Sequence, residues 1–343
     1  MMMSRSSNQS SWGIMPHRRS GSHGLRLSAV SLSMGGCVAA PSAPVPLRDL
    51  LRHAMDAGVS HFDITPDTRN PEGSAAAIAV ALSSVLPYRD TLVFSARVGL
   101  NSWQGGMTGF GSRKSLLSGL DSLLLHTGLD YIDLLYAHRY DTGTPLEETV
   151  AALASAVQQG KALYAGLSSY APSMVRAALP HFAELGVPLV SYQASYSLLD
   201  RWIEEGVVDI LQRHGVGCVA AAPLAHGALS DPVWSEPRQD IPPLPALSRI
   251  ATERGQTLAQ LALSWVLRDP VITSALVTAA RPRHIAEARA AAEQSIFTPA
   301  DLAAVETCCP PPERACPPGH PHRKEPKFSP GQRTDSRLSP LDG

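Results

Sequence analysis

Short apolar runs recur along the chain, and each is followed by a longer stretch in which apolar residues repeat with a helical period. Most of the short runs are apolar throughout rather than alternating, which is typical of strands covered on both faces. The pattern predicts eight strands, at residues 30–34, 59–64, 91–96, 131–137, 162–168, 188–194, 216–222 and 274–279.

Helical periodicity fills the intervals between the predicted strands. Prolines precede the first helix and Gly58 ends it, while Ser74 is a candidate cap for the second. The predicted helices cover about 47–57, 74–86, 112–125, 145–159, 172–185, 201–214, 246–254, 257–267 and 283–292. Strict alternation of strand and helix predicts the α/β class and a closed (β/α)8 TIM barrel. A doubly wound sheet is the competing fold, but no GxGxxG motif follows the first strand.

The two ends of the chain differ from this pattern. Residues 1–23 are rich in Ser and Arg and lack acidic residues, and we predict a disordered leader there. The barrel is expected over residues 24–306. Residues 307–343 are rich in proline and poor in apolar residues, which predicts a disordered tail.

Composition excludes several classes of function. The 29 basic and 30 acidic residues leave a net charge of −1 with no basic stripe, so no nucleic-acid partner is expected. No apolar run is long enough to cross a membrane. Cys308, Cys309 and Cys316 lie near His320 and His322, but without the regular paired spacing of a metal site. We therefore expect no metal and a reduced, cytoplasmic protein.

Polar side chains stand at the ends of three consecutive predicted strands: Asp63, Arg97 and His138. One interpretation is structural, with Asp63 and Arg97 forming an ion pair and His138 a satisfied polar residue. However, active sites of β/α barrels are built at the carboxyl ends of the strands, where these three side chains converge. The sequence therefore favours a ligand site there.

Several blocks of sequence together resemble the aldo-keto reductase family, in the branch that holds bacterial glyceraldehyde 3-phosphate reductases and potassium-channel β subunits. The resemblance extends over about residues 24–306. The matching blocks are GVSHFD at 58–63, YIDLLYAHR at 131–139, QGKALYAGLSSY at 159–170, QASYSLL at 193–199, PLA at 223–225 and QLALSWVL at 260–267.

The resemblance implies a (β/α)8 barrel that reduces aldehydes and ketones with NADPH. In that family an Asp, Tyr, Lys and His tetrad serves the reaction: the Tyr protonates the carbonyl oxygen, the Lys paired with Asp lowers the Tyr pKa, and the His orients the carbonyl. Asp63 and His138 match their positions, whereas the Tyr position is Thr68 and the Lys position is Arg97.

The two departures change the chemistry. A threonine hydroxyl is a far weaker acid than a phenol and so a poor proton donor. Arg97 keeps its charge and presents a planar fork that could pair with Asp63 or bind a carboxylate or phosphate. Tyr140 and Asp67 are other acids near the strand ends, although neither matches a catalytic position of the family.

The cofactor half of the resemblance is mixed. Ser168, Ser169 and Gln193 match residues that bind the nicotinamide amide, and Pro223, Leu224 and Ala225 match the pyrophosphate motif. Ala221 occupies the position at which the family has an aromatic ring that stacks on the nicotinamide. Near the 2′-phosphate and the adenine, Arg281 and Glu287 persist while other family residues are replaced. NADP(H) is the cofactor that the resemblance implies.

Three functions stay open. The chain could be an NADPH-dependent carbonyl reductase whose activity is weakened or lost. It could be a non-redox barrel enzyme that uses Asp63, Arg97 and His138 for dehydration or isomerisation by proton transfer. It could be a non-catalytic protein that senses a nucleotide. The expected partner is a small carbonyl or anionic molecule, and the sequence leaves open whether the chain forms a homo-oligomer.

Overall fold

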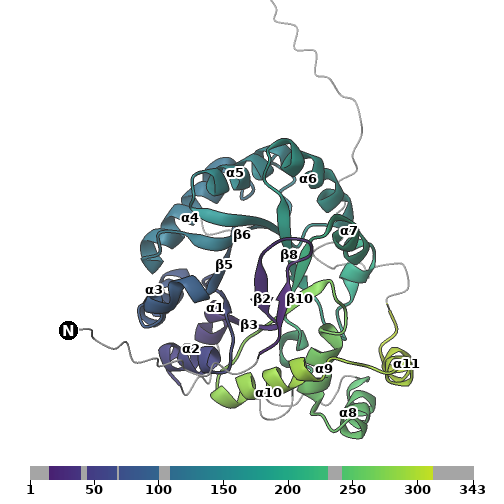
Figure 1. Ribbon diagram of the computed structural model, residues 1–343. Coiled ribbons are helices and arrows are strands. Elements are labelled where there is room, and N and C mark those ends of the chain that lie inside the picture. The colour runs from purple at the N-terminus through teal and green to yellow at the C-terminus, as the bar shows by residue number, and fades with distance from the viewer. Residues whose placement is uncertain (1–14, 40–44, 68, 100–108, 231–241, 312–343) are drawn as a thin grey trace, which may run out of the picture.

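The computed structural model describes residues 15–39, 45–67, 69–99, 109–230 and 242–311. Eight parallel strands close into a barrel and helices surround it, which confirms the predicted (β/α)8 fold (Figure 1). Around the barrel the strands are β3 (Val30–Ser33), β4 (His61–Asp63), β5 (Val93–Val98), β6 (Ile132–His138), β7 (Ala162–Ser168), β8 (Leu189–Ser195), β9 (Gly217–Ala221) and β10 (Ile272–Val277).

Helices occupy the intervals in which the sequence predicts them, and two further helices, at 34–39 and 299–308, were not predicted. Their bounds are α1 (Met34–Ala39), α2 (Leu47–Asp56), α3 (Pro71–Leu82), α4 (Arg113–Thr127), α5 (Leu146–Gln158), α6 (Pro172–Glu184), α7 (Val207–His214), α8 (Leu244–Glu253), α9 (Leu258–Val266), α10 (Pro282–Glu293) and α11 (Pro299–Cys308), with 3₁₀ turns η1 (Leu86–Thr91), η2 (Trp202–Glu204) and η3 (Ala225–Gly227). No helix in these described ranges is both long and apolar enough to span a membrane.

Two local predictions are wrong. The helix expected over 201–214 is divided into η2 and α7, because Gly206 between them has φ of 111°, which a continuing helix does not allow. The cap of α3 is Asn70, whose side chain accepts from the Gly73 N–H. The hydroxyl of Ser74, the predicted cap, instead accepts from the Asp67 N–H.

A hairpin closes the amino-terminal end of the barrel. Its antiparallel strands are β1 (His17–Arg19) and β2 (Arg26–Ser28). The Ser20 hydroxyl donates to the Val190 carbonyl at 3.0 Å, and Arg18 donates to the Ile272 carbonyl at 3.0 Å. The side chain of Leu27 is fully buried in the cluster formed by Leu134, Tyr136, Val190, Val219 and Leu276 inside the barrel.

The hairpin corrects the predicted start of the folded domain. Residues 15–23 belong to the fold rather than to a disordered leader, while residues 1–14 lie outside the described part of the chain. Strands of three residues are too short for a periodic signal, and contacts with the barrel specify them. At the other end, α11 extends to Cys308, beyond the predicted boundary at 306, and most of the predicted tail lies outside the described residues.

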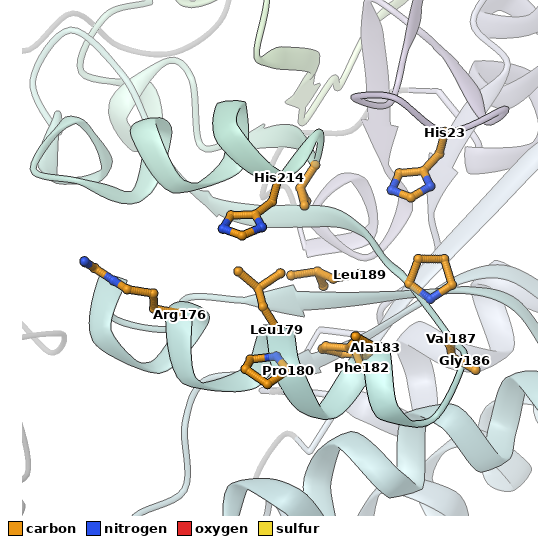
Figure 2. A pocket seen from close by; sticks show the side chains of 12 residues that line it. His23, Arg176, Leu179, Pro180, Phe182, Ala183, Gly186, Val187, Leu189 and His214 are labelled. Carbon is orange, nitrogen blue, oxygen red and sulfur yellow. The ribbon is translucent and has the colours of Figure 1, made fainter.

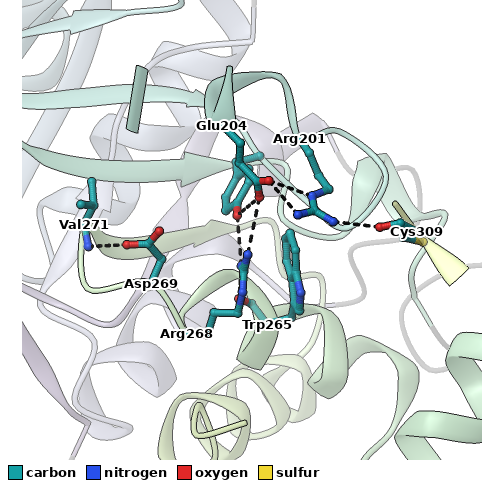
Figure 3. A network of polar contacts seen from close by, with 8 residues as sticks. Arg201, Glu204, Trp265, Arg268, Asp269, Val271 and Cys309 are labelled. Carbon is teal, nitrogen blue, oxygen red and sulfur yellow. Dashed lines mark hydrogen bonds and ion pairs between the residues drawn. The ribbon is translucent and has the colours of Figure 1, made fainter. Parts of the chain in front are cut away.

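A buried ionic network holds the end of α11 against the barrel (Figure 3). Glu204 accepts from Arg201 at 2.7 Å and pairs with Arg268 at 3.5 Å. The two guanidinium groups lie 4.9 and 3.6 Å from the ring centroid of Trp265. Arg201 also donates to the backbone carbonyl of Cys309 at 2.8 Å. The Glu204 carboxylate therefore compensates two arginine charges in a largely water-excluded place.

We expect Glu204→Ala to destabilise the fold by about 3 kcal/mol, because it leaves two partly buried guanidinium groups uncompensated. Urea unfolding followed by circular dichroism measures the change. Glu253→Ala is the matched control, since Glu253 pairs with Arg249 on an exposed face at 3.9 Å. That variant should change the free energy of unfolding by less than about 0.5 kcal/mol. Equal effects of the two variants would contradict the assignment.

Candidate active site

The register of the barrel brings the predicted site residues onto one edge. Asp63 on β4 is paired with Ser95 on β5, and His138 on β6 is paired with Ser168 on β7. Ser168 is in turn paired with Gln193 on β8. Asp63, His138 and Ser168 end their strands, and Arg97 is the penultimate residue of β5. The carboxyl ends of neighbouring parallel strands meet at one rim, so these groups form a continuous arc.

Asp63 is fully buried and accepts three hydrogen bonds. The Thr65 N–H donates to Oδ1 at 3.2 Å, while the Ser95 hydroxyl and Gln193 Nε2 donate to Oδ2 at 3.1 and 3.3 Å. All three donors are uncharged groups. They supply the polar contacts that a carboxyl group needs when it leaves water.

Arg97 does not form the predicted alternative ion pair with Asp63. Within the described ranges, the ion pairs include none between these two side chains. Arg97 is half-buried, and its buried Nε has no hydrogen-bond partner among the described residues. Its backbone N–H donates to the Thr65 hydroxyl at 2.9 Å. The guanidinium therefore keeps donor capacity at the rim.

His61 lies below Asp63 on the same strand and is also fully buried. Its ring contacts the Ser31 hydroxyl through Nδ1 at 2.6 Å and the Ser95 hydroxyl through Nε2 at 2.9 Å. Burial lowers the pKa of the imidazole, although the neighbouring Asp63 carboxylate opposes part of that effect. Sequence reasoning missed His61, whose only signal is a histidine two residues before Asp63 on the same strand.

His138 is positioned by the next strand. Its Nδ1 contacts the Ser168 hydroxyl at 3.1 Å. The residues after three strand ends have positive φ without being glycine: Arg139 at 48°, Ser169 at 60° and Ala222 at 47°. Backbone held in this region costs energy and is concentrated at functional sites. The strained positions follow the same rim as the polar arc.

Gln193 links the arc to the expected cofactor edge. Its Nε2 binds Asp63, and its Oε1 is buried with no hydrogen-bond partner in the described ranges. Ser168 is buried and Ser169 is half-buried beside it. An unsatisfied buried amide oxygen is costly, so a ligand that donates an N–H there would be bound favourably. The carboxamide of a nicotinamide has such a group.

The remaining predicted residues lie on the β9 and β10 side of the rim. Pro223 and Leu224 are buried and Ala225 is half-buried after β9. Arg281 is exposed at the N-cap of α10, where backbone N–H groups favour anions, and Glu287 is half-buried on the same helix. Thr68 lies outside the described residues, so its place at the rim stays a prediction.

The two acids considered as substitutes for the tyrosine of the family, Asp67 and Tyr140, have other contacts in the structure. Arg69 binds the Asp67 carboxylate at 3.2 Å and holds its pKa below the usual range. Tyr140 is half-buried, and its ring packs edge-on against Tyr170 at 6.1 Å. The Tyr136 hydroxyl is fully buried and forms a hydrogen bond with the Ser191 hydroxyl at 2.8 Å. Burial raises its pKa.

The comparisons with known proteins agree with this geometry. The aldo/keto reductase family model matches residues 33–309. The chain belongs to the aldo/keto reductase family. It is 38% identical to an L-glyceraldehyde 3-phosphate reductase of Escherichia coli (strain K12) over 324 residues, which covers 87% of this chain and 94% of that protein. It is 29% identical to a putative voltage-gated potassium channel subunit beta of Schizosaccharomyces pombe over 304 residues, covering 80% and 87%.

A separate cavity of about 580 Å³ lies at the opposite end of the barrel (Figure 2). It is lined by α6, by His23 in the hairpin turn and by His214 at the end of α7, and its floor is mainly apolar. Leu189 and Val216 in its wall are at the amino-terminal ends of β8 and β9. Barrels of this family are expected to place chemistry at the other end. Among the described residues, no group of three or more metal-ligating side chains is suited to a metal ion.

Packing beneath the rim can be tested at Gly166. A Cβ there would lie 2.4 Å from the Tyr136 ring and 2.9 Å from the Ser191 carbonyl, so we expect Gly166→Ala to cost about 2 kcal/mol of stability. At the helical control, Gly119→Ala, the nearest atoms are 3.7 Å away. The control should be neutral or stabilising by up to about 1 kcal/mol. Thermal unfolding of both variants measures the difference, and a stable Gly166→Ala variant would contradict the packing described.

Proposed function

We propose that this protein binds NADP(H) and is a weak carbonyl reductase whose substrate carries an anionic group. The observation that supports this most is the separation of Asp63 from Arg97. Neutral donors satisfy Asp63, and the buried Nε of Arg97 has no hydrogen-bond partner in the part of the chain that the structure describes. A guanidinium that is not occupied by a carboxylate of its own chain can bind a phosphate or carboxylate through two hydrogen bonds.

Cofactor binding is supported by the donor and acceptor groups of the β7 and β8 ends. The unpartnered Oε1 of Gln193 suits the amide N–H of a nicotinamide, and Ser168 and Ser169 lie on the adjacent strand. Arg281 at the start of α10 suits a phosphate of the dinucleotide. When bound, NADPH would supply the hydride. The chain's own residues would orient the nicotinamide and the carbonyl beside it.

Weak reduction follows from the acid–base groups. The threonine at position 68 cannot protonate a carbonyl oxygen as a phenol does, and the guanidinium of Arg97 is a poorer partner for proton transfer than the ammonium of a lysine. Ala221 offers no ring to stack on the nicotinamide. Similarity to an L-glyceraldehyde 3-phosphate reductase favours a phosphorylated aldehyde among anionic carbonyl compounds.

The first test is a titration with NADPH, followed by the fluorescence of the cofactor. We expect saturable binding, with slow turnover on a panel of aldehydes. The double variant Thr68→Tyr with Arg97→Lys should raise kcat by about 10²-fold, which is the scale of one general acid. Absence of NADPH binding would contradict the proposal. Unchanged turnover in the double variant would contradict the explanation that the two replaced residues limit the rate.

The second test concerns the anionic group. Arg97→Gln should weaken binding of a phosphorylated aldehyde at least about tenfold and leave a neutral aldehyde of the same length unaffected, because one charge-assisted contact is lost. Arg48→Gln is the control, since Arg48 is exposed and already pairs with Asp49 at 3.3 Å. Isothermal titration with NADPH present gives both affinities. Equal losses for charged and neutral aldehydes would contradict a role for Arg97 in anion binding.

A non-redox function is the second candidate, and the contact between the Ser95 hydroxyl and both Asp63 and His61 favours it. Such a linked acid and imidazole could exchange a proton with a carbon next to a carbonyl group. Incubation of a phosphorylated ketone with the protein in D₂O, without NADPH, tests it by proton NMR. Deuterium incorporation at that carbon would support it, and no incorporation above the buffer rate would exclude it.

A further inference from the structure

A chain of hydrogen bonds crosses the inside of the barrel beneath the rim. It starts at the Asp63 carboxyl and passes through the Ser95 hydroxyl to Nε2 of His61. From Nδ1 of His61 it continues to the Ser31 hydroxyl, then to the Ser274 hydroxyl, and ends at the backbone carbonyl of Ser28. Every side chain in it is fully buried and the links come from four strands, β4, β5, β3 and β10.

The carbonyl end of this chain determines the direction of its first bonds. The Ser28 carbonyl can only accept, so Ser274 must use its single hydroxyl hydrogen there, at 2.7 Å. The contact between Ser31 and Ser274 then requires the hydrogen of Ser31. Ser31 has no second hydrogen to offer His61, and the contact at 2.6 Å therefore needs a proton on Nδ1.

At the Asp63 end of this chain of hydrogen bonds, one further hydrogen is required. If His61 is neutral, its only ring proton is on Nδ1 and Nε2 accepts from the Ser95 hydroxyl. The contact between Ser95 and Asp63 then has no hydrogen unless Asp63 is protonated. If Asp63 is ionised, Ser95 donates to it, and Nε2 must carry a second ring proton. Either arrangement contains the same number of protons.

We propose that Asp63 and His61 together hold one exchangeable proton at neutral pH, which they share through the Ser95 hydroxyl. The five contacts need five hydrogens, while an ionised Asp63 with a neutral His61 would supply only four. A missing hydrogen would leave two buried oxygen or nitrogen lone pairs facing each other at bonding distance, which is more costly than keeping the proton.

The shared proton gives the pair zero net charge, and this explains why Asp63 needs no cation from the rim. Tyr136 on β6 is electrostatically coupled to Asp63 and to Arg97 on β5, and burial is the largest cause of its raised pKa. His61 is thus a positioning residue that acts through Ser95 on Asp63. The inference deepens the proposed function but does not rest on ligand binding, because it concerns the protein alone.

Neutron diffraction from a deuterium-exchanged crystal of the full chain at neutral pH counts these protons directly. We expect a deuteron in each of the five contacts between Asp63 and the Ser28 carbonyl. A deuteron on both ring nitrogens of His61, or one on Asp63 with one on Nδ1, would each support the proposal. Four deuterons, with one contact empty, would overturn it.

A second experiment measures the same proton in solution. Unfolded Asp and His have pKa values of about 3.9 and 6.5. Above pH 7.5 the unfolded pair has therefore lost the exchangeable proton, while the folded pair keeps it. Wild-type stability should therefore fall as the pH rises. Asp63→Asn supplies permanent amide hydrogens and has no proton to lose. Relative to this variant, the unfolding equilibrium constant of the wild type should rise about tenfold per pH unit from pH 7.5 to 8.5.

Asp141→Asn is the matched control. Asp141 is also buried and accepts from the Gly111 and Gly143 N–H groups and the Thr144 hydroxyl, and together these bonds hold its pKa below the usual value despite burial. It is ionised in both states above pH 7.5, so its effect on stability should not vary with pH there. If the ratio of the unfolding equilibrium constants of the wild type and Asp63→Asn is equally independent of pH, the shared proton is disproved. This outcome does not depend on whether the protein binds NADPH.

Discussion

The burial of one carboxyl group determines the organisation of this rim. Asp63 is the last residue of β4, and its carboxyl group is fully buried in the barrel. The β1–β2 hairpin closes the other end of the barrel. A carboxyl group in that position requires hydrogen bonds or a counter-charge. Ser95, Gln193 and the Thr65 N–H meet the need with uncharged donors. Arg97 consequently forms no ion pair with a carboxylate of the described residues, and its place near the end of β5 puts it at the mouth.

Much of this arrangement could be predicted from the sequence. Strands covered on both faces produce continuous apolar runs, so their number and order were visible, and with them the barrel. Polar residues at the ends of those runs, Asp63, Arg97 and His138, therefore marked one edge. The resemblance to a family then indicated which further residues, such as Gln193, belong to the same edge.

The rest depended on contacts between strands that no single run reveals. Ser31, His61 and Ser274 are isolated polar residues in separate apolar segments, and only the register of the closed barrel brings them into one hydrogen-bonded chain. The separation of Asp63 from Arg97 has the same origin, since charge complementarity alone suggested that they pair. The β1–β2 hairpin was missed because strands of three residues are held by the barrel rather than by their own pattern.

Membership of the aldo/keto reductase family and the local chemistry of the rim lead to one account. The positions expected to bind a nicotinamide amide include an acceptor, Gln193 Oε1, that has no hydrogen-bond partner among the described residues. At the positions expected to activate a carbonyl oxygen, the sequence has a threonine and an arginine, which serve proton transfer less well than a phenol and an amine. We therefore propose a site that holds a dinucleotide and an anion more effectively than it transfers a hydride.

The central claim is that Asp63 is satisfied without Arg97, which leaves the guanidinium to the ligand. A crystal structure of the protein with NADP⁺ and a phosphorylated aldehyde tests it most directly. The account predicts that the phosphate of the aldehyde accepts hydrogen bonds from Arg97 while Asp63 keeps its contacts with Ser95 and Gln193. A structure in which Arg97 forms a two-point ion pair with Asp63, with the phosphate bound elsewhere, would contradict it.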